Sequence, residues 1–355
     1  MDKNKKIGFA VIGYGGMGSW HASTCADDFK DTAELIGIYD IKPERRAAAE
    51  AEGIHAFSSR EELLADDRID LVTVATPNDV HKEIAIAAMA AGKNVISEKP
   101  VALSQEELEE MIAASKKYGK LFTVHQNRRW DPDFKCVQKI LADNELGKVF
   151  RIESRVQGSR GIPGDWRNQK AHGGGMVLDW GIHLLDQALR IGEGRKLISV
   201  YAELTNVTNE ECDDGFRVTL IFEGDLSMYV EVTTSNFIEL PRWYILGENG
   251  SAVINDWDLN GEIVKVSDWE NRDAVPILAG VGLTKTMAPR REDTIRTEDL
   301  PWADSDIRDF YRNVMAVIEG KAESRIKLDE VARVMRLMEA IFESAEKKQV
   351  IKFEA

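Results

Sequence analysis

The sequence of 355 residues is poor in cysteine and in long apolar runs, and each shortage excludes a class of protein. Its three cysteines, Cys25, Cys136 and Cys212, stand far apart, so they form neither a disulfide framework nor the paired spacing of a structural zinc site. No run of about 18 apolar residues occurs, which argues against a membrane-spanning helix. Unpaired cysteines are typical of a reducing compartment, so we expect a cytoplasmic protein.

The chain also has fewer basic than acidic residues, with 46 lysines and arginines and 61 aspartates and glutamates, which gives a formal net charge of −15. Such a chain repels polyanions, so nucleic acid is not an expected partner. Lysines near the start precede an apolar run, as in a signal peptide, but four glycines between positions 13 and 18 interrupt it. A strand followed by a glycine turn fits this segment better. The length and the hydrophobic content of 43% predict two domains with large cores.

Apolar runs of strand length alternate with helical patterns over the first 125 or so residues. The predicted strands cover residues 6–12, 34–39, 71–75, 94–97 and 121–124, and the predicted helices between them cover 43–52, 79–91 and 104–118. Continuous apolar runs are typical of strands that are covered on both faces, as in a parallel sheet. The overall class is therefore α/β, and residues 1–125 are predicted to form a Rossmann domain that binds a dinucleotide.

The pattern changes after Trp130, where segments that alternate between apolar and polar residues appear. These predicted strands cover residues 149–156, 197–205, 217–222 and 226–233, with hairpin turns at 223–225 and 247–250. Residues 126–355 are thus predicted to form an α+β domain for substrate binding and oligomerisation, with a large, mostly antiparallel open sheet. An open face suits a homo-dimer or homo-tetramer contact. The helical segment 305–347 is placed to pack back on the first domain.

A G-x-G-x-x-G motif follows the first predicted strand and opens a helix. It consists of Gly13, Tyr14, Gly15, Gly16, Met17 and Gly18. In such motifs the first glycine makes a tight turn, the second lets the backbone approach a pyrophosphate, and the third lets the helix pack closely on the strand. The amides at the helix N-terminus then face the phosphates. Glycine turns alone are common, but this one also precedes an acidic residue at the end of the second strand.

That acidic residue is Asp40, 22 residues beyond Gly18. We expect its carboxylate to bind the 2′- and 3′-hydroxyls of an adenosine ribose. A 2′-phosphate would meet like charge, at a cost of about 4 kcal/mol per charge pair at about 4 Å and an effective dielectric constant near 20. This favours NAD over NADP. The nearby Lys42, Arg45 and Arg46 either shield a phosphate or belong to a solvated helix start.

Two further clusters carry acid–base groups. Glu98-Lys99-Pro100 follows the fourth strand, at the sheet edge where ligands bind. Lys99 is therefore predicted to face the nicotinamide. A Lys-Pro pair is also common in surface turns, which is the alternative interpretation. Asp179 and His183 follow a triple glycine and are four residues apart, which on an α-helix places their side chains on one face about 6 Å apart. Histidine suits the removal of a hydroxyl proton, but such a pair is also common as a structural contact. Because no further ligands are spaced nearby, no metal is expected.

A third cluster combines residues 126–130, which follow the fifth strand, with Asp165, Trp166 and Arg167. Polar and aromatic groups at a strand end suit the hydroxyls and the ring face of a sugar, and an ordinary domain junction is the alternative interpretation.

Taken together, these motifs resemble those of the Gfo/Idh/MocA oxidoreductases, and the resemblance covers roughly residues 5–350. The motifs that carry this resemblance are the glycine motif, Ala75-Thr76-Pro77-Asn78 with His81, Glu98-Lys99-Pro100, Asn127 to Trp130, and the Asp179/His183 pair.

The resemblance implies a role for each matching residue. The candidate cofactor-binding residues are Gly13, Tyr14, Gly15, Gly16, Met17, Gly18, Asp40, Thr76, Pro77, Asn78, His81, Glu98, Lys99, Trp166 and Arg167. The candidate substrate-binding residues are Lys99, Asn127, Arg128, Asp179 and His183, and of these Lys99, Asp179 and His183 are the candidate catalytic residues.

We therefore predict an NAD-dependent dehydrogenase that oxidises a secondary ring hydroxyl of a sugar, glycoside or cyclitol. His183 would accept the proton, Lys99 would stabilise the alkoxide, and Asp179 would hold His183 or the substrate. Two alternatives stay open. One is a glycoside-cleaving enzyme that uses transient oxidation and elimination, and the other is a non-catalytic dinucleotide sensor, a class that tends to lack the lysine or the histidine.

Overall fold

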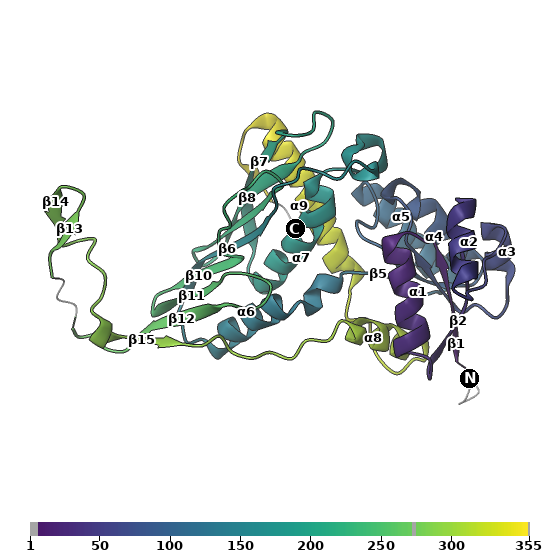
Figure 1. Cartoon of the computed structure of the whole chain (residues 1–355), viewed down its shortest axis with the longest axis horizontal. Helices are drawn as coiled ribbons and strands as arrows, with labels where there is room; N and C mark the ends of the chain where they lie inside the picture. Colours follow the sequence, from purple (N-terminus) through teal and green to yellow (C-terminus); the bar gives the residue numbers. More distant parts are fainter. Residues whose placement is uncertain (1–5, 272–274, 354–355) are drawn as a thin grey trace.

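The computed structural model describes residues 6–271 and 275–353, which form two halves, each built on its own sheet (Figure 1). The first sheet has five parallel strands in the order β2-β1-β3-β4-β5. The strands are β1 (Ile7–Ile12), β2 (Ala33–Tyr39), β3 (Leu71–Val74), β4 (Asn94–Ser97) and β5 (Phe122–Val124). The predicted Rossmann domain is confirmed. Its strand order reverses between β1 and β3, which is where ligands bind on such sheets.

Five helices connect these strands. They are α1 (Gly16–Asp28), α2 (Pro43–Ala51), α3 (Arg60–Ala65), α4 (His81–Ala90) and α5 (Gln105–Tyr118). Since β2 and β4 lie on opposite sides of the β1–β3 pair, right-handed crossovers put α1 and α4 on opposite faces of the sheet. The residues predicted to start and end α5 do so. The Ser104 side chain accepts a hydrogen bond from the Glu107 amide, and Gly119 ends the helix in a left-handed conformation.

The second half is a nine-stranded sheet in the order β15-β12-β11-β10-β6-β9-β8-β7-β16. Only β6 and β9 run parallel, so the predicted, mostly antiparallel open sheet is confirmed. The strands are β6 (Val149–Gln157), β7 (Leu197–Thr205), β8 (Gly215–Phe222), β9 (Leu226–Thr233), β10 (Trp243–Gly247), β11 (Gly250–Ile254), β12 (Gly261–Val266), β15 (Ile295–Glu298) and β16 (Ile351–Lys352). The sequence analysis placed a turn at 247–250 but assigned no strand beyond residue 233.

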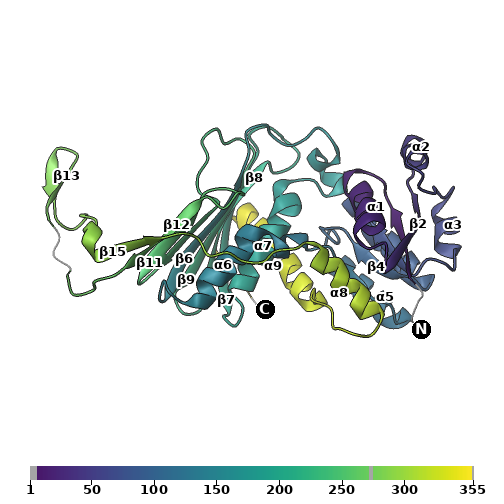
Figure 2. The same ribbon diagram turned by 60° about the horizontal axis from the view of Figure 1, so that its bottom comes forward.

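Three helices cover one face of this sheet, and its other face is left open (Figures 1 and 2). They are α6 (Pro132–Asp143), α7 (Ile182–Ile191) and α9 (Leu328–Lys347). Helix α8 (Arg308–Ile318) lies instead against α1, where the Tyr311 hydroxyl contacts His21 Nδ1. Part of the segment 305–347 thus packs back on the first half. We retain the domain boundary after residue 125 as a proposal, because it falls between β5 and a 3₁₀ helix, Asn127–Trp130.

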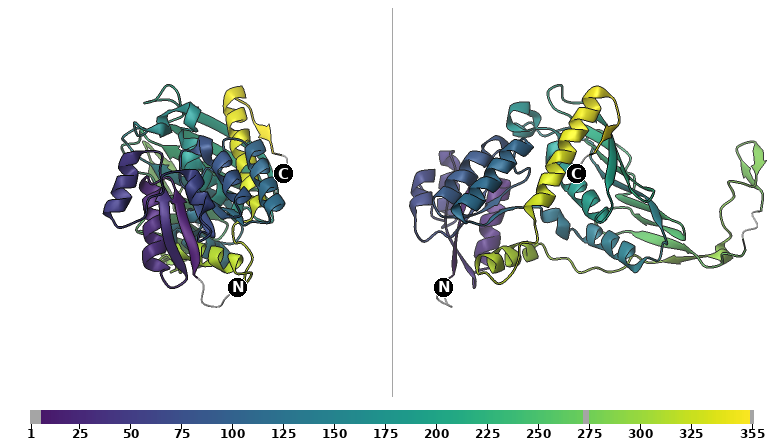
Figure 3. Two further views of the ribbon diagram at one scale, coloured as in Figure 1. Left: turned by 90° about the vertical axis from the view of Figure 1, so that its right-hand side faces the viewer. Right: turned by 180° about the vertical axis from the view of Figure 1, so that it is seen from behind.

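Beyond the sheet edge formed by β15, the chain makes a small hairpin that stands away from the rest of the molecule (Figures 1 and 3). Its strands, β13 (Ile277–Ala279) and β14 (Gly282–Thr284), form a separate two-stranded sheet. None of the helices in the described part of the chain combines the length and the apolar character needed to cross a bilayer.

Candidate active site

The glycine motif adopts the turn that a bound pyrophosphate requires. Gly13 has a φ of +93°, and a Cβ there would lie 2.4 Å from the Ala75 carbonyl oxygen. A Cβ on Gly18 would lie 1.8 Å from the Gly13 carbonyl oxygen, so only glycine lets α1 approach β1 this closely. A Cβ on Gly16 would meet nothing within 4 Å. The turn therefore leaves open space in front of the first amides of α1, where an anion is stabilised.

A cleft of about 1110 Å³ runs from the glycine turn along the carboxyl ends of β3 and β4 to the second half. The predicted residues that line it are Gly13, Gly15, Gly16, Met17, Asp40, Thr76, Pro77, Asn78, Glu98, Lys99, Trp166, Arg167 and Asp179. Six other predicted residues are not part of its lining: Tyr14, Gly18, His81, Asn127, Arg128 and His183. The cleft has the dimensions and the position expected for a dinucleotide.

Two of the residues outside the lining support it from behind. The buried ring of His81 contacts the carbonyl oxygens of Thr76 and Pro100 at 2.9 and 3.0 Å, so it braces two turns of the cleft. The Tyr14 hydroxyl donates to Glu52 at 2.8 Å, away from the glycine turn. Their predicted role in binding the cofactor stays a prediction.

Asp40 lies at the end of the cleft beside the glycine turn and is 3% exposed. Its carboxylate already accepts hydrogen bonds from the Tyr14 and Lys42 amides, at 2.7 and 2.8 Å, and from Arg45 at 3.1 Å. A carboxylate has about four acceptor positions, so one remains for a ribose hydroxyl. The same carboxylate thus tethers the glycine turn to the end of β2.

Lysine and aspartate from different halves meet in this cleft. Lys99 follows β4, and its Nζ donates to the Asp179 carboxylate at 3.2 Å and to the Asp179 carbonyl oxygen at 3.0 Å. The second carboxylate oxygen of Asp179 lies 3.5 Å from Arg167 Nε. The Lys99 and Asp179 side chains are 18% and 16% exposed, so the pair is shielded but still reachable from the cleft.

The backbone that carries Asp179 differs from the sequence-based expectation. Residues Val177–Gly181 form a π-helical turn, and α7 begins only at Ile182, so the predicted single α-helix through Asp179 and His183 was wrong. In a π-helical turn the backbone hydrogen bonds close over five residues and not four. Among the described residues, the Asp179 carboxylate contacts Lys99 and Arg167, and no hydrogen bond joins it to His183.

His183 lies next to this pair but deeper, with 4% exposure. Burial lowers the pKa of His183 well below 6.5, and the nearby positive charges of Lys99 and Arg128 lower it further. The ring is therefore neutral at neutral pH. Its Nδ1 is buried without a hydrogen-bond partner among the described residues, as are Asn127 Oδ1 and Arg128 Nε. Buried polar atoms without partners are costly, and these three belong to the residues predicted to bind the substrate.

Tryptophans form an aromatic wall near His183. The Arg128 guanidinium lies 4.2 Å from the ring centre of Trp180 and 5.3 Å from that of Trp257, and Arg128 also bonds Asp131 at 2.9 Å. The Trp180 ring centre is 6.2 Å from that of His183. Trp257 was not among the predicted site residues, because it lies in a loop between β11 and β12 that is remote from every motif.

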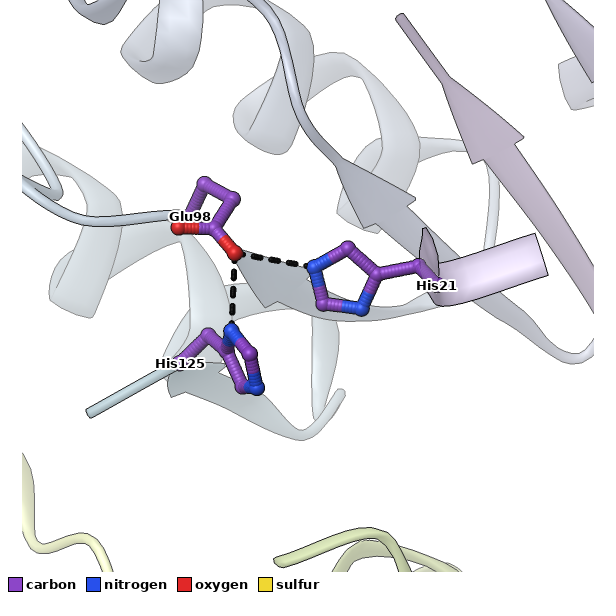
Figure 4. A group of neighbouring side chains, drawn as sticks. All are labelled: His21, Glu98 and His125. Atoms are coloured by element: carbon purple, nitrogen blue, oxygen red, sulfur yellow. Dashed lines mark hydrogen bonds and ion pairs between the residues drawn. The ribbon is translucent and has the colours of Figure 1, made fainter. Parts of the chain in front are cut away.

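Glu98 was predicted as a site residue, but the two histidines that bind it, His21 and His125, were not (Figure 4). Glu98 Oε1 accepts from His21 Nε2 at 2.9 Å and from His125 Nδ1 at 2.7 Å, and Glu98 Oε2 accepts from the Lys99 amide at 3.0 Å. Burial alone would raise the pKa of Glu98, but the bonds from the two imidazoles hold it well below its usual value. These distances are those of N–H···O hydrogen bonds. The role of these three residues is to hold Lys99 in place.

Comparison with known proteins places this geometry in a family. A family model described as "Oxidoreductase family, NAD-binding Rossmann fold" matches residues 7–126, and a second, the GFO/IDH/MocA C-terminal domain, matches residues 134–253. The chain belongs to the GFO/IDH/MocA oxidoreductase family. The resemblance inferred from its motifs is thereby confirmed, and so is the assignment as an NAD-binding oxidoreductase, a dehydrogenase that acts on CH–OH groups.

Similar members of the GFO/IDH/MocA family cover most of the chain. The crystal structure of an NAD-binding protein from Listeria innocua has 45% sequence identity and a TM-score of 0.95, over 98% of this chain and 100% of that one. The scyllo-inositol 2-dehydrogenase (NADP(+)) IolW of Bacillus subtilis is 28% identical over 98% of this chain and 96% of its own length. The myo-inositol 2-dehydrogenase of Thermotoga maritima is 33% identical over 57% of this chain and 59% of its own length. The chain is thus related to inositol dehydrogenases.

Proposed function

We propose that this enzyme uses NAD to oxidise a secondary ring hydroxyl of a cyclitol, a sugar or a glycoside. The observation that carries the proposal is the contact between Lys99 and Asp179 within a cleft that the glycine turn also lines. It brings an ammonium group from the coenzyme half to a carboxylate from the other half. The inositol dehydrogenases among the relatives support a cyclic polyol as the substrate class.

In this proposal each side chain has one role. NAD, when bound, supplies the acceptor for the hydride that leaves the carbon bearing the hydroxyl. The neutral His183 ring accepts the hydroxyl proton. Lys99, held by Asp179, stabilises the negative charge that develops on the substrate oxygen. Asp179 also has an acceptor oxygen turned towards Arg167 and the cleft.

The substrate ring would be recognised by the groups around His183. Asn127 Oδ1 and Arg128 Nε offer one acceptor and one donor that lack partners, which suits hydroxyl groups. Trp180 and Trp257, which both contact the Arg128 guanidinium, would form the aromatic part of this substrate site. We also propose that the protein works in the cytoplasm and as a homo-oligomer that pairs open sheet faces, since its three cysteines are free and that face carries no helix.

The test is a screen for NADH absorbance over inositols, free sugars, glycosides and nucleotide sugars. We expect NADH formation with at least one class, and a kcat/KM at least about 100-fold lower for Lys99→Met with NAD affinity retained. Lys139→Met removes an exposed lysine of α6 and serves as the matched control. Release of an aglycone without NADH would contradict the proposal and support the glycoside-cleaving alternative. Equal activity of Lys99→Met and the wild type would remove Lys99 from the mechanism.

A further inference from the structure

Three consecutive glycines, residues 173–175, lead into the π-helical turn, and the proposed function gives them no role. Gly175 has a φ of +105°, and a Cβ there would lie 2.2 Å from Asp213 Oδ1. A Cβ on Gly174 would lie 2.3 Å from the carbonyl oxygen of Arg167, which accepts from the Gly175 amide at 2.9 Å. The chain is therefore packed so closely that no side chain fits at Gly174 or Gly175, and the Asp213 carboxylate is one of the groups packed against it.

The helix that follows the glycines has no cap of its own. The first amides of a helix lack partners within it, and a side-chain oxygen of the N-cap residue usually accepts from one of them. Here the π-helical turn Val177–Gly181 continues into α7, and its N-cap residue is Met176, which has no such oxygen. Asp213 takes this role from another segment. Its carbonyl oxygen accepts from the Met176 amide at 3.0 Å, and its Oδ2 accepts from the Val177 amide at 2.9 Å.

The segment that carries Asp213 is fixed to one end of the large sheet, just before β8. The next residue, Asp214, donates its amide to the carbonyl oxygen of Thr205 at 2.9 Å, at the end of β7. The Asp214 carbonyl oxygen accepts from the amide and the hydroxyl of Thr234, at 3.2 and 2.7 Å, just after β9. Asp213 itself is only 8% exposed. It therefore connects the ends of three neighbouring strands to the start of the helix.

The place where this helix starts decides where Asp179 lies, because Asp179 is its third residue. The Asp179 amide donates to the Gly175 carbonyl oxygen at 3.0 Å. Lys99 Nζ donates to both the main-chain carbonyl oxygen and the carboxylate of Asp179. Because one of these two acceptors belongs to the backbone, rotation of the Asp179 side chain alone could not restore the contact if the turn shifted.

We infer that Asp213 is a positioning residue of the active site: it caps the helix that carries Asp179 and so keeps that residue in contact with Lys99. Asp213 is not among the described residues that line the cleft, so it acts through Asp179. The expected effect on turnover rests on the proposed function, whereas the expected effect on the surroundings of Lys99 does not.

Competitive labelling of lysines tests the surroundings of Lys99 without any turnover. Limited acetylation with acetic anhydride, followed by mass spectrometry of peptides, gives the labelling rate of Lys99 relative to that of the exposed Lys321. Asp213→Ala removes the acceptor of the Val177 amide, so Lys99 should be labelled at least about threefold faster than in the wild type. Asp213→Asn keeps an acceptor oxygen and should restore the wild-type rate. Asp143→Ala, which removes an exposed carboxylate of α6, is the matched control and should change nothing.

Steady-state kinetics separates a positioning residue from a merely structural one. For Asp213→Ala we expect kcat to fall about tenfold with NAD affinity within about threefold of the wild type, because a small misplacement at the reacting oxygen costs turnover. Asp213→Asn should bring kcat back to within about twofold of the wild type. Asp213→Val, which also lacks an acceptor, replaces Asp213→Ala if that variant does not fold, and the same changes are expected of it.

Two results would overturn the inference. One is a labelling rate of Lys99 or a kcat in Asp213→Ala equal to that of the wild type, and the other is an Asp213→Asn variant as impaired as Asp213→Ala. A wild-type protein that oxidises no class of substrate, although the labelling of Lys99 changes as expected, would contradict the proposed function and still support the positioning of Asp179 by Asp213.

Discussion

The two walls of the cleft are built from different kinds of interaction. The coenzyme wall is made largely of backbone, with a glycine turn that tolerates no Cβ at Gly13 or Gly18 and a helix N-terminus with open amides. The substrate wall is made of side chains from distant segments, such as Lys99, Asp179 and His183. The coenzyme wall is encoded within a short motif, whereas the substrate wall forms only when the two halves of the chain have folded against each other. Mutations should therefore affect stability and coenzyme binding on one wall, and turnover on the other.

The largest effect is expected on the substrate wall. His183→Asn removes the proposed proton acceptor, so kcat should fall by about 10²- to 10⁴-fold while the affinity for NAD is unchanged. The measurement is steady-state NADH formation together with calorimetric titration of NAD. His55→Asn changes an exposed histidine near α3 and is the control. Turnover within a few-fold of the wild type would show that His183 is structural.

The coenzyme wall should respond to glycine substitution in a position-specific way. Gly18→Ala forces a Cβ against the Gly13 carbonyl oxygen, so we expect the free energy of unfolding to fall by about 3 kcal/mol and NAD affinity to fall at least tenfold. Gly16→Ala meets open space and should change the free energy of unfolding by less than about 0.5 kcal/mol. Chemical denaturation and NAD titration measure both. If the two variants behave alike, steric contact does not define this wall.

The same contrast explains what the sequence could predict. The five parallel strands, the glycine turn, Asp40 and Lys99 were located correctly because each follows from a local pattern: an apolar run, a spacing or a strand end. The π-helical turn at Asp179 was not anticipated, since the periodicity of a single helix gives no signal for one wider turn. Trp257, His21 and His125 were missed because they lie on segments separate from the residues they contact, and only the tertiary fold brings them together.

The π-helical turn should make stability depend on pH. Asp213 Oδ2 accepts from the Val177 amide at 2.9 Å and so anchors the start of the turn, and burial raises the pKa of Asp213 to about 7. The unfolded carboxyl titrates near pH 4. Between these values the folded state holds one more proton, so this group lowers the stability as the pH rises from about 4 to 7.

The asparagine of Asp213→Asn cannot ionise, so this variant should not show the loss of stability between about pH 4 and pH 7. Its free energy of unfolding should be close to that of the wild type at pH 5 and higher than that of the wild type at pH 8, by an amount of the order of a few kcal/mol. Asp225→Asn, at an exposed hairpin turn, is the matched control and should track the wild type. Urea unfolding at the two pH values measures the difference. If Asp213→Asn loses stability with pH as steeply as the wild type, another group carries the effect.

The smallest expected effect is a change in substrate binding without a change in the chemical step. Trp257 is 46% exposed and contributes an aromatic ring but no acid–base group. Trp257→Leu should therefore raise KM for the substrate about three- to tenfold and leave kcat nearly unchanged. This change in KM corresponds to roughly 1 kcal/mol of binding free energy. Trp302→Leu, at 80% exposure and away from the Arg128, Trp180 and Trp257 group, should alter neither constant. A fall in kcat with constant KM would contradict this division, because it would place Trp257 among the groups that act only in the transition state.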